Sequence, residues 1–313
     1  MNIEQRVSGA VRQARRIRRR LSPQAKTGLG IDHLPIPLYV DLAYHVMLRR
    51  NADPAGKQHY IRRLRAREVT RMEMLDVLRG SEEFRFQVPF VDLQTSLHQS
   101  RCDFVRSLPR AARILDIGGT HQSNREGAFV HMGYCYPFDE LVILDLPHED
   151  RHEIYRHSER ADRVETALGP VTYSYGSMAD LSQFADATFD LVYSGQSIEH
   201  VTPPDGDLTL KEVHRVLKAG GWLGVDTPNG PVCRMQMQAF INPDHKIEYS
   251  HAEFAAKLSD AGFEIVDAKG LNYIGHRAAQ GGFSDVETAR HAGMHAEIED
   301  CYLLAYVARK PLS

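Results

Sequence analysis

A buried strand that ends in an acid and a glycine turn is the feature that most constrains this chain. The run 112–120 reads as an apolar strand, then Asp116, then a turn containing Gly118 and Gly119. An acid at the end of a parallel strand, followed by glycines that let the backbone approach a ligand, is typical of a nucleotide-type cofactor site. A second apolar run, 141–145, also ends in an acid. Together the two runs predict an α/β sheet with a ligand at the carboxyl ends of its strands.

Apolar runs of strand length recur from residue 113 onwards and alternate with helical segments. Amphipathic helices are expected over 207–217 and 250–261, the second of which is followed by a glycine. Strands separated by helices imply a parallel sheet with both faces covered. The expected strands are 113–117, 141–145, 171–175, 189–194, 222–227, 263–268 and 302–309.

The composition sets looser limits on the class of protein. A chain of 313 residues is long enough for about two domains. No apolar run approaches the roughly 20 residues of a membrane-spanning helix, and the N-terminus has no apolar signal core. Four cysteines lie far apart in the sequence, which favours reduced thiols in a cytoplasmic protein over disulfides or a zinc site.

The first 21 residues differ in charge from the rest of the chain. They contain seven arginines and one glutamate, although the whole chain has a net charge of −3. A basic amphipathic arm over 1–21 is expected to touch an anionic membrane surface or a protein partner, unless it is simply a solvated arm. Nucleic acid is not an expected partner, because the remainder of the chain is acidic. The apolar stripe of the arm consists of Ile3, Val7, Ala10, Ala14, Ile17 and Leu21.

A linker is expected over 22–37, followed by a compact helical domain over 38–107. Asp53 before Pro54 is a strong signal for the start of a helix. Residues 38–86 resemble a small bacterial helical domain of unknown function, which occurs beside glycosyltransferases and methyltransferases of surface-polysaccharide clusters. The resemblance implies an interaction or positioning role, although Asp53 and Gly56 can equally be residues that only shape a turn. The matching residues are Tyr44, Leu48, Arg50, Asp53, Pro54, Gly56, Tyr60, Leu64, Ser81, Glu83 and Phe84.

The remainder of the chain, 108–313, resembles a class I S-adenosylmethionine-dependent methyltransferase over about 110–310. The resemblance is carried by four segments in the same order as in that family: 115–118, Asp145, 189–192 and 217–221. It implies a Rossmann-like seven-stranded methyltransferase sheet, preceded here by an all-helical domain. It also implies S-adenosyl-L-methionine as the cofactor and a polar small molecule or glycan as the acceptor.

The resemblance implies a role for each cofactor-site residue. Asp116, Gly118, Gly119 and Thr120 would line the methionine portion, and Asp145 followed by Leu146 would meet the ribose. Ser177 and Met178 would flank the adenine, and Ser194 with Gln196 would close the site. The chain departs from the family at Thr120 and Gln122, where glycines are usual, and at Ser177, where an acid is common. These departures predict altered cofactor binding. For Asp116, the alternative to a role in the cofactor site is that it only caps the following helix.

Three residues are the candidates for chemistry on the acceptor. A hydroxyl acceptor needs a base, and His200, which follows the fourth expected strand, is the leading candidate. Glu199 could orient that base or bind the acceptor, although this Glu-His pair is often structural in the family. His245 is the second candidate base, and its alternative role is to support the helix expected at 250–261.

No metal site is expected from the sequence. His291 and His295 are spaced to share a helix face, but no third ligand is placed with them. The main expectation is O-methylation of a saccharide or related polar metabolite in surface-glycan assembly. A quinone, lipid or small-molecule methyltransferase is one alternative, and a non-catalytic scaffold with a degenerate methyltransferase fold is another.

Overall fold

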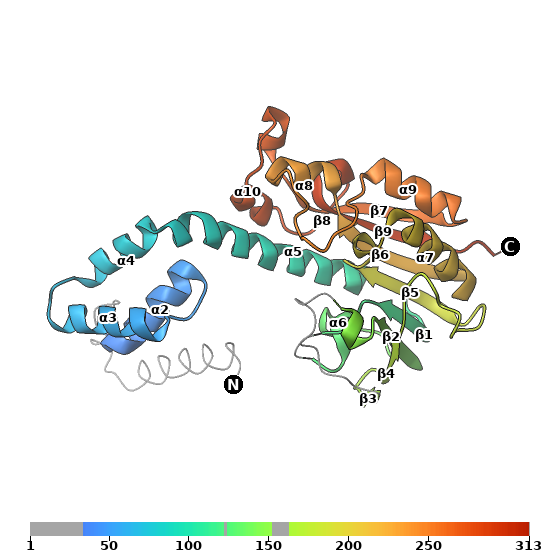
Figure 1. Ribbon diagram of the computed structural model, residues 1–313, viewed down its shortest axis with the longest axis horizontal. Coiled ribbons are helices and arrows are strands. Elements are labelled where there is room, and N and C mark those ends of the chain that lie inside the picture. The colour runs from blue at the N-terminus through green and yellow to red at the C-terminus, as the bar shows by residue number, and fades with distance from the viewer. Residues whose placement is uncertain (1–33, 122–123, 152–162, 313) are drawn as a thin grey trace, which may run out of the picture. The chain divides into compact units, whose positions relative to one another are not determined.

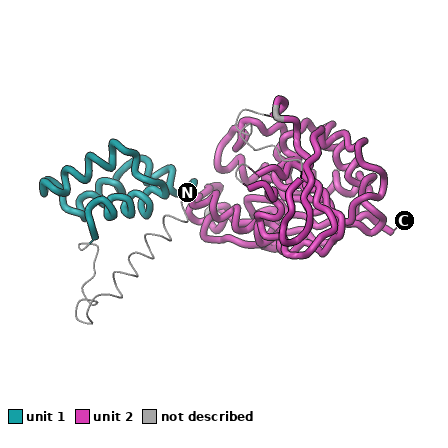
Figure 2. The backbone as a smooth tube through the Cα atoms, turned by 90° about the horizontal axis from the view of Figure 1, so that it is seen from below, with its two compact units in different colours: residues 1–91 teal, residues 92–313 magenta. Residues whose placement is uncertain are grey.

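The computed structural model describes residues 34–121, 124–151 and 163–312, and it divides the chain into two units between Val91 and Asp92 (Figure 2). The first unit is helical, and the second is built on a single sheet (Figure 1). The predicted arm at 1–21 and most of the predicted linker lie outside the described residues. None of the described helices is long and apolar enough to cross a membrane.

The first described helix of the helical unit begins inside the predicted linker, at Ile36. Its second helix starts as the sequence predicts: the Asp53 carboxylate accepts the Gly56 backbone N–H at 2.8 Å. A Cβ on Gly56 would lie 2.6 Å from the Tyr44 hydroxyl oxygen. Asp53 and Gly56 therefore have a sufficient structural explanation as turn residues. The unit consists of α2 (Ile36–Leu48), α3 (Pro54–Arg65), α4 (Arg71–Gly80) and the π-helical turn η3 (Glu83–Gln87).

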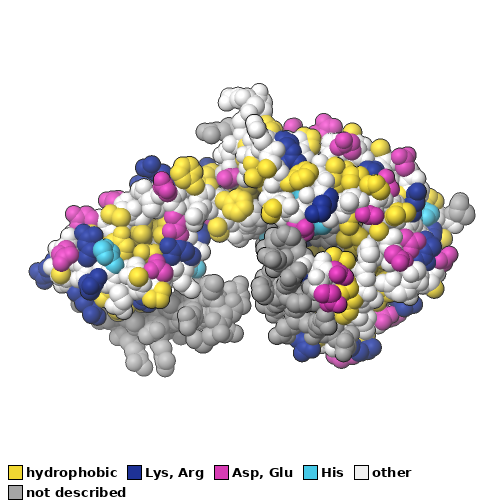
Figure 3. Space-filling model, in the orientation of Figure 1, with side chains coloured by type: hydrophobic (Ala, Val, Ile, Leu, Met, Phe, Trp, Pro, Cys, Tyr) yellow, Lys and Arg dark blue, Asp and Glu magenta, His cyan; other side chains and the backbone are white. Residues whose placement is uncertain are grey.

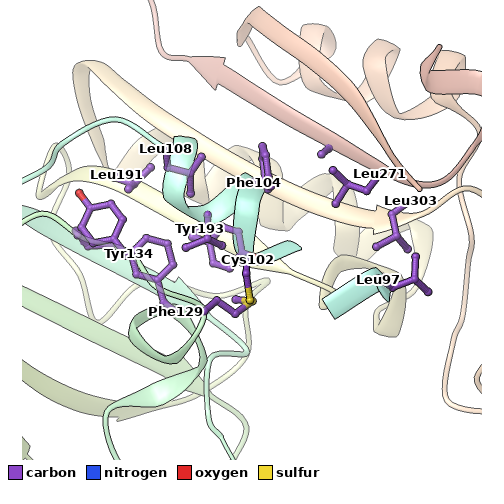
Figure 4. Close-up of a cluster of buried hydrophobic side chains, with 14 of the residues drawn as sticks. Leu97, Cys102, Phe104, Leu108, Phe129, Tyr134, Leu191, Tyr193, Leu271 and Leu303 are labelled. Atoms are coloured by element: carbon purple, nitrogen blue, oxygen red, sulfur yellow. The ribbon is translucent and has the colours of Figure 1, made fainter. Parts of the chain in front are cut away.

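Helix α5 (Val88–Ser107) contains the division between the two units, whereas the sequence places the domain boundary at its end, after residue 107. From Asp92 onwards it belongs to the second unit. Phe104 of this helix and Leu108, which follows it, are buried in the same cluster as Leu191 of the sheet (Figure 4). The amphipathic pattern shows that this helix buries one face, but it does not show which unit covers that face.

The sheet contains all seven predicted strands and confirms the α/β expectation. Its order is β3-β4-β2-β1-β5-β6-β9-β7-β8. Two short strands, which the sequence did not predict, extend the two edges: β3 (Arg163–Glu165) and β8 (Met294–His295). The other strands are β1 (Arg113–Ile117), β2 (Glu140–Asp145), β4 (Pro170–Tyr175), β5 (Phe189–Gly195), β6 (Leu217–Pro228), β7 (Glu264–Tyr273) and β9 (Cys301–Arg309).

Strand direction determines where a ligand can bind. Strand β1 pairs in parallel with both β2 and β5, and β2 pairs in parallel with β4. Strand β9 runs antiparallel to β6 and β7. Because β1, β2, β4 and β5 run the same way, their carboxyl ends meet at one edge of the sheet.

Helices cover both faces of the sheet, and adjacent strand residues therefore enter different cores. Tyr193 belongs to the cluster that contains Phe129, and its neighbour Val192 belongs to the cluster that contains Phe254. The longer helices of this unit besides α5 are α6 (Gly127–His131), α7 (Pro203–Val216), α8 (Gly230–Gln236), α9 (His251–Asp260) and α10 (Asp285–Arg290). Short 3-10 helices are η4 (His148–Asp150), η6 (Ile198–His200), η7 (His276–Gln280) and η8 (Ile298–Asp300).

Candidate cofactor and acceptor site

A cavity of about 720 Å³ lies at the carboxyl ends of the parallel strands. The turns that follow β1, β2, β4 and β5 line it, together with the loop before α9. The predicted site residues on its wall are Gly118, Thr120, Asp145, Leu146, Ser177, Met178, Gln196, Glu199, His200 and His245. Residues on the wall that sequence reasoning did not select include Glu149, Asp150, Arg151, Ser197, Asn242, Asp244 and Lys246.

The turn after β1 can be made only by glycines. Gly118 has φ of 76°, and a Cβ there would lie 2.3 Å from Ser197 Oγ. A Cβ on Gly119 would lie 1.8 Å from Asp116 Oδ2. Ser197 Oγ in turn donates to the Ile117 carbonyl at 2.9 Å. The two glycines therefore allow the chain to fold tightly over the end of β1. Gly118 lines the cavity, whereas Gly119, also predicted as a site residue, is buried and does not.

Asp116 lies behind this turn and not on the cavity wall. Its side chain is buried against Gly119 and accepts a backbone hydrogen bond from Phe129 of α6. Its Oδ2 has no hydrogen-bond partner among the described residues. Burial raises the pKa of the Asp116 carboxyl to about 7. This placement favours the alternative role for Asp116, in which it holds the turn and the start of α6 instead of lining the methionine portion.

The raised pKa of Asp116 predicts a pH-dependent stability. The folded protein keeps this carboxyl protonated up to about pH 7, whereas the unfolded chain ionises it near its ordinary value. Its stabilising contribution is therefore fully present below the ordinary pKa of 3.8, declines as pH rises between that value and about 7, and is lost above about pH 7. The free energy of unfolding of the wild type relative to Asp116→Asn should fall by about 1 kcal/mol between about pH 6 and 8. Urea unfolding of both proteins measures this difference, and an unchanged difference would show that the pKa is not raised.

Asp145 ends β2 with its carboxylate on the cavity wall. Oδ1 accepts the Leu146 backbone N–H at 2.7 Å and lies 3.5 Å from Arg151 Nε. Arg151 Nε also donates to the Leu146 carbonyl at 2.8 Å. These contacts hold the carboxylate at the end of the strand, where it can accept hydrogen bonds from a diol in the cavity.

The turn after β4 places Ser177 and Met178 on the same wall. Ser177 Oγ accepts the Ala179 backbone N–H at 3.2 Å, and Met178 packs against the buried cluster around Leu181. Thr120, one of the departures from the family pattern, also lines the cavity, and its buried Oγ1 has no partner among the described residues. The other departure, Gln122, lies outside the described residues.

Gln196 reaches the wall and Ser194 does not. Ser194 is buried beneath it, and Ser197 lines the cavity in its place. Gln196 has φ of 55°, and its Nε2 donates to Asp226 Oδ1 at 2.9 Å. The left-handed backbone at Gln196 turns the chain out of β5 and directs the following residues into the cavity.

A buried ionic network that sequence reasoning missed supports Gln196. Asp226 of β6 is fully buried, and Arg101 of α5 donates from Nε to its Oδ1 at 2.7 Å. The Tyr193 hydroxyl donates to the other oxygen of Asp226 at 2.5 Å. A Cβ on Gly195 would lie 2.2 Å from that Tyr193 hydroxyl oxygen. The network therefore fixes the end of β5 immediately before the candidate catalytic residues.

The three candidate catalytic residues come together on the acceptor side of the cavity. His200 Nδ1 lies 3.0 Å from Asp244 Oδ2, and the rings of His200 and His245 are 4.8 Å apart between centroids. His245 Nδ1 lies 2.7 Å from Glu248 Oε1. Burial lowers the pKa of His200, and the nearby His245 adds to the shift, so the ring is neutral near pH 7.

Glu199 lies beneath the two histidines. Its side chain is fully buried, Oε2 accepts the Thr227 hydroxyl at 3.1 Å, and Oε1 has no hydrogen-bond partner among the described residues. Its backbone carbonyl accepts the Lys246 N–H at 2.8 Å, which ties η6 to the loop that carries His245. Burial raises the pKa of the Glu199 carboxyl to about 7.

The other histidine pair considered from the sequence lies elsewhere. In the edge strand β8, Nε2 of His295 lies 2.9 Å from the backbone carbonyl oxygen of His291, within hydrogen-bond distance. Both rings lie near Tyr273, and neither residue belongs to the cavity wall. This geometry does not bring the two rings together as ligands.

Comparison with known proteins identifies both parts of the chain. Residues 137–225 match the family model described as "Methyltransferase domain", and residues 22–88 match "Domain of unknown function (DUF4214)". The second match includes the segment predicted as a linker. One relative, from Mycolicibacterium smegmatis, is named a probable S-adenosylmethionine-dependent methyltransferase and is 34% identical over 129 residues, or 41% of this chain and 46% of the relative.

A second relative, from Mycobacterium tuberculosis, has the same type of name and is 34% identical over 156 residues, or 48% of this chain and 53% of the relative. The chain thus spans about half the length of the curated relatives that it matches. Among solved structures, a methyltransferase in complex with the Haloferax volcanii Trm112 activator is 19% identical, with a TM-score of 0.48 over 72% of this chain and 95% of that chain. Residues 137–225 therefore resemble a methyltransferase domain of the kind found in S-adenosylmethionine-dependent enzymes, and residues 22–88 resemble a domain of unknown function.

Proposed function

We propose that this protein transfers the methyl group of S-adenosylmethionine to a hydroxyl oxygen of a saccharide or a related polar acceptor. One observation carries the proposal. The same cavity is lined by the turns after β1, β2 and β4 and by Glu199, His200 and His245. Cofactor and acceptor could therefore lie side by side in one cavity, which a direct transfer between them requires.

The first of these walls fits the cofactor of the family. The Asp145 carboxylate would accept the ribose hydroxyls, and Ser177 would lie beside the adenine, with apolar contact from Leu146 and Met178. The exposed backbone at Gly118 and the unpartnered Thr120 hydroxyl would face the methionine portion. S-adenosylmethionine supplies an activated methyl group on a sulfonium, so the protein has to align the acceptor and exclude water.

The second wall fits a hydroxyl acceptor. His200 lies on the cavity with Nδ1 held by Asp244, an arrangement that orients the other ring nitrogen as a proton acceptor. Asn242 and Lys246 add further polar groups to this wall. A wall of amide, ammonium, imidazole and carboxylate groups suits a polyhydroxylated acceptor better than a quinone or a lipid tail.

The acceptor class can be tested by mass spectrometry of surface glycans from cells with and without the gene. We expect the glycan from cells with the gene to be heavier by one CH₂ group at a hydroxyl position. Identical glycan masses in the two strains would remove the saccharide assignment and leave a polar small molecule as the acceptor.

We also propose that the basic arm at 1–21 binds anionic membrane surfaces. Its seven arginines support this, although the arm lies outside the described residues. On the face of the molecule shown in Figure 3, basic and acidic side chains are interspersed, a pattern that does not favour nucleic acid as a partner. Deletion of residues 1–21 should reduce cosedimentation with anionic vesicles, and equal binding by the truncated protein would refute the membrane role.

A further inference from the structure

Three side chains on the acceptor wall have the composition of a metal-binding group. Glu199, His200 and His245 each offer one ligand atom, and these three atoms all lie within 4.8 Å of one another. Among the residues that the structure describes, no other set of three histidine, cysteine or acidic side chains converges in this way. The group also lines the 720 Å³ cavity, so an ion held there would be reachable from the acceptor space.

The surroundings of the two histidines orient them as ligands would be oriented. His200 Nδ1 is held by Asp244 at 3.0 Å, and His245 Nδ1 is held by Glu248 at 2.7 Å. Glu248 is itself anchored by Arg234 at 2.9 Å. A carboxylate on one ring nitrogen fixes the ring and makes the other nitrogen a better donor to a metal. Nε2 is therefore the coordinating atom expected from each ring.

The third member has an unsatisfied oxygen. Glu199 is fully buried, and its Oε1 has no partner among the described residues, whereas Oε2 accepts the Thr227 hydroxyl. A buried carboxylate oxygen without a partner is costly, because it has lost its water and gained nothing in exchange. A cation coordinated by Oε1 would remove that cost.

We propose that Glu199, His200 and His245 bind a divalent transition-metal ion on the acceptor side of the cavity. Two imidazoles and one carboxylate favour Zn²⁺, Co²⁺, Mn²⁺ or Fe²⁺ over Mg²⁺ and Ca²⁺, which prefer all-oxygen ligand sets. Three protein ligands leave coordination positions open, as in catalytic metal sites. The open positions face the space in which the acceptor would lie.

The site rests on the proposed function and gives it a more specific substrate class: a hydroxyl acceptor with an adjacent oxygen that can chelate the ion. Coordination would lower the pKa of the hydroxyl, and its proton would pass to solvent. The oxygen then forms its bond to the methyl carbon as the carbon–sulfur bond breaks, with no change of oxidation state. In this metal-bound form His200 is a ligand, and it serves as the base only in the metal-free form.

Co²⁺ binding to the full-length protein, first stripped with a chelator, tests the site directly. We expect one equivalent of Co²⁺ to bind and to give visible absorption typical of nitrogen and oxygen ligands. Glu199→Gln should weaken the affinity at least 10-fold, and Asp244→Asn, which leaves all three ligands in place, should weaken it by about 10-fold. His276→Ala, which removes an exposed histidine outside the cavity, should leave it unchanged. No bound Co²⁺, or equal affinity in all four proteins, would overturn the proposal.

Turnover and cofactor binding separate the failure of this site from the failure of the proposed function. If the metal site and the proposed function are both correct, the metal-stripped protein binds S-adenosylmethionine normally. Its rate of methyl transfer falls at least 10-fold and recovers when Co²⁺ or Mn²⁺ is added. Full turnover in the stripped protein would overturn the metal site and leave His200 as the base. Absence of S-adenosylmethionine binding with Co²⁺ still bound would overturn the proposed function alone.

Discussion

Replacing Asp145 with alanine is expected to raise the Kd for S-adenosylmethionine by about 100-fold. The carboxylate ends β2 on the cavity wall, where it is placed to accept two ribose hydroxyls. Two hydrogen bonds to a charged acceptor are worth about 3 kcal/mol or more in total, which corresponds to at least this factor. Asp145→Asn keeps one acceptor oxygen and should lose about 10-fold. Isothermal titration calorimetry measures both effects.

The matched control lies next to the opposite end of the same strand. Asp139 is exposed in the turn before β2, so Asp139→Ala removes a carboxylate of the same type without touching the cavity. Its affinity for the cofactor should equal that of the wild type. If Asp145→Ala binds the cofactor as tightly as Asp139→Ala does, the ribose assignment is wrong.

Replacing His200 with alanine in the metal-free protein is expected to lower kcat by about 100-fold or more, because a positioned base contributes at least that factor. The Kd for S-adenosylmethionine should change by no more than about 3-fold, because in the proposed function His200 meets the acceptor and not the cofactor. This split between kcat and cofactor affinity separates a role in chemistry from a role in folding. A methyl-transfer assay with saturating cofactor provides the measurement.

The control for this substitution is again a histidine outside the cavity. His276→Ala should retain wild-type kcat and cofactor affinity, because this ring is exposed in η7. Near-normal turnover by His200→Ala would exclude His200 as the base. Loss of cofactor binding together with turnover would instead indicate that the substitution disturbs the turn after β5.

The strands were predictable because each is an apolar run with turn residues at its ends. The edge strands β3 and β8 were not, because three- and two-residue pairings carry no periodic signal. The association of α5 with the second unit was also missed. A helical pattern shows only that one face is buried, and the packing of Phe104 and Leu108 against the sheet depends on distant residues.

Within the site, chain position was predictable and side-chain direction was less so. The residues at the strand ends do meet at one cavity, as expected from the parallel topology. Asp116, Gly119 and Ser194 were expected on its wall, but all three are buried and do not line the cavity. The loop that carries His245 reaches the wall through its backbone bonds to Glu199, which no sequence spacing indicates.

The sequence contains a signal for the buried Arg101–Asp226 ion pair. Leu97, Arg101, Phe104 and Leu108 are spaced to share one helix face, so a charged residue stands among apolar ones. Asp226 likewise interrupts an apolar strand. A charge at a buried position requires a partner of opposite sign, and the two residues supply it for each other.

Titration of the full-length protein with S-adenosylmethionine tests the central claim most directly. Thr120 and Ser177, the described departures from the family pattern, both line the cavity, so a functional cofactor site predicts binding of one equivalent despite them. The Asp145→Ala protein should bind S-adenosylmethionine about 100-fold more weakly than the wild type. Absence of any binding to the wild type would contradict the account and favour a non-catalytic scaffold built on a methyltransferase fold.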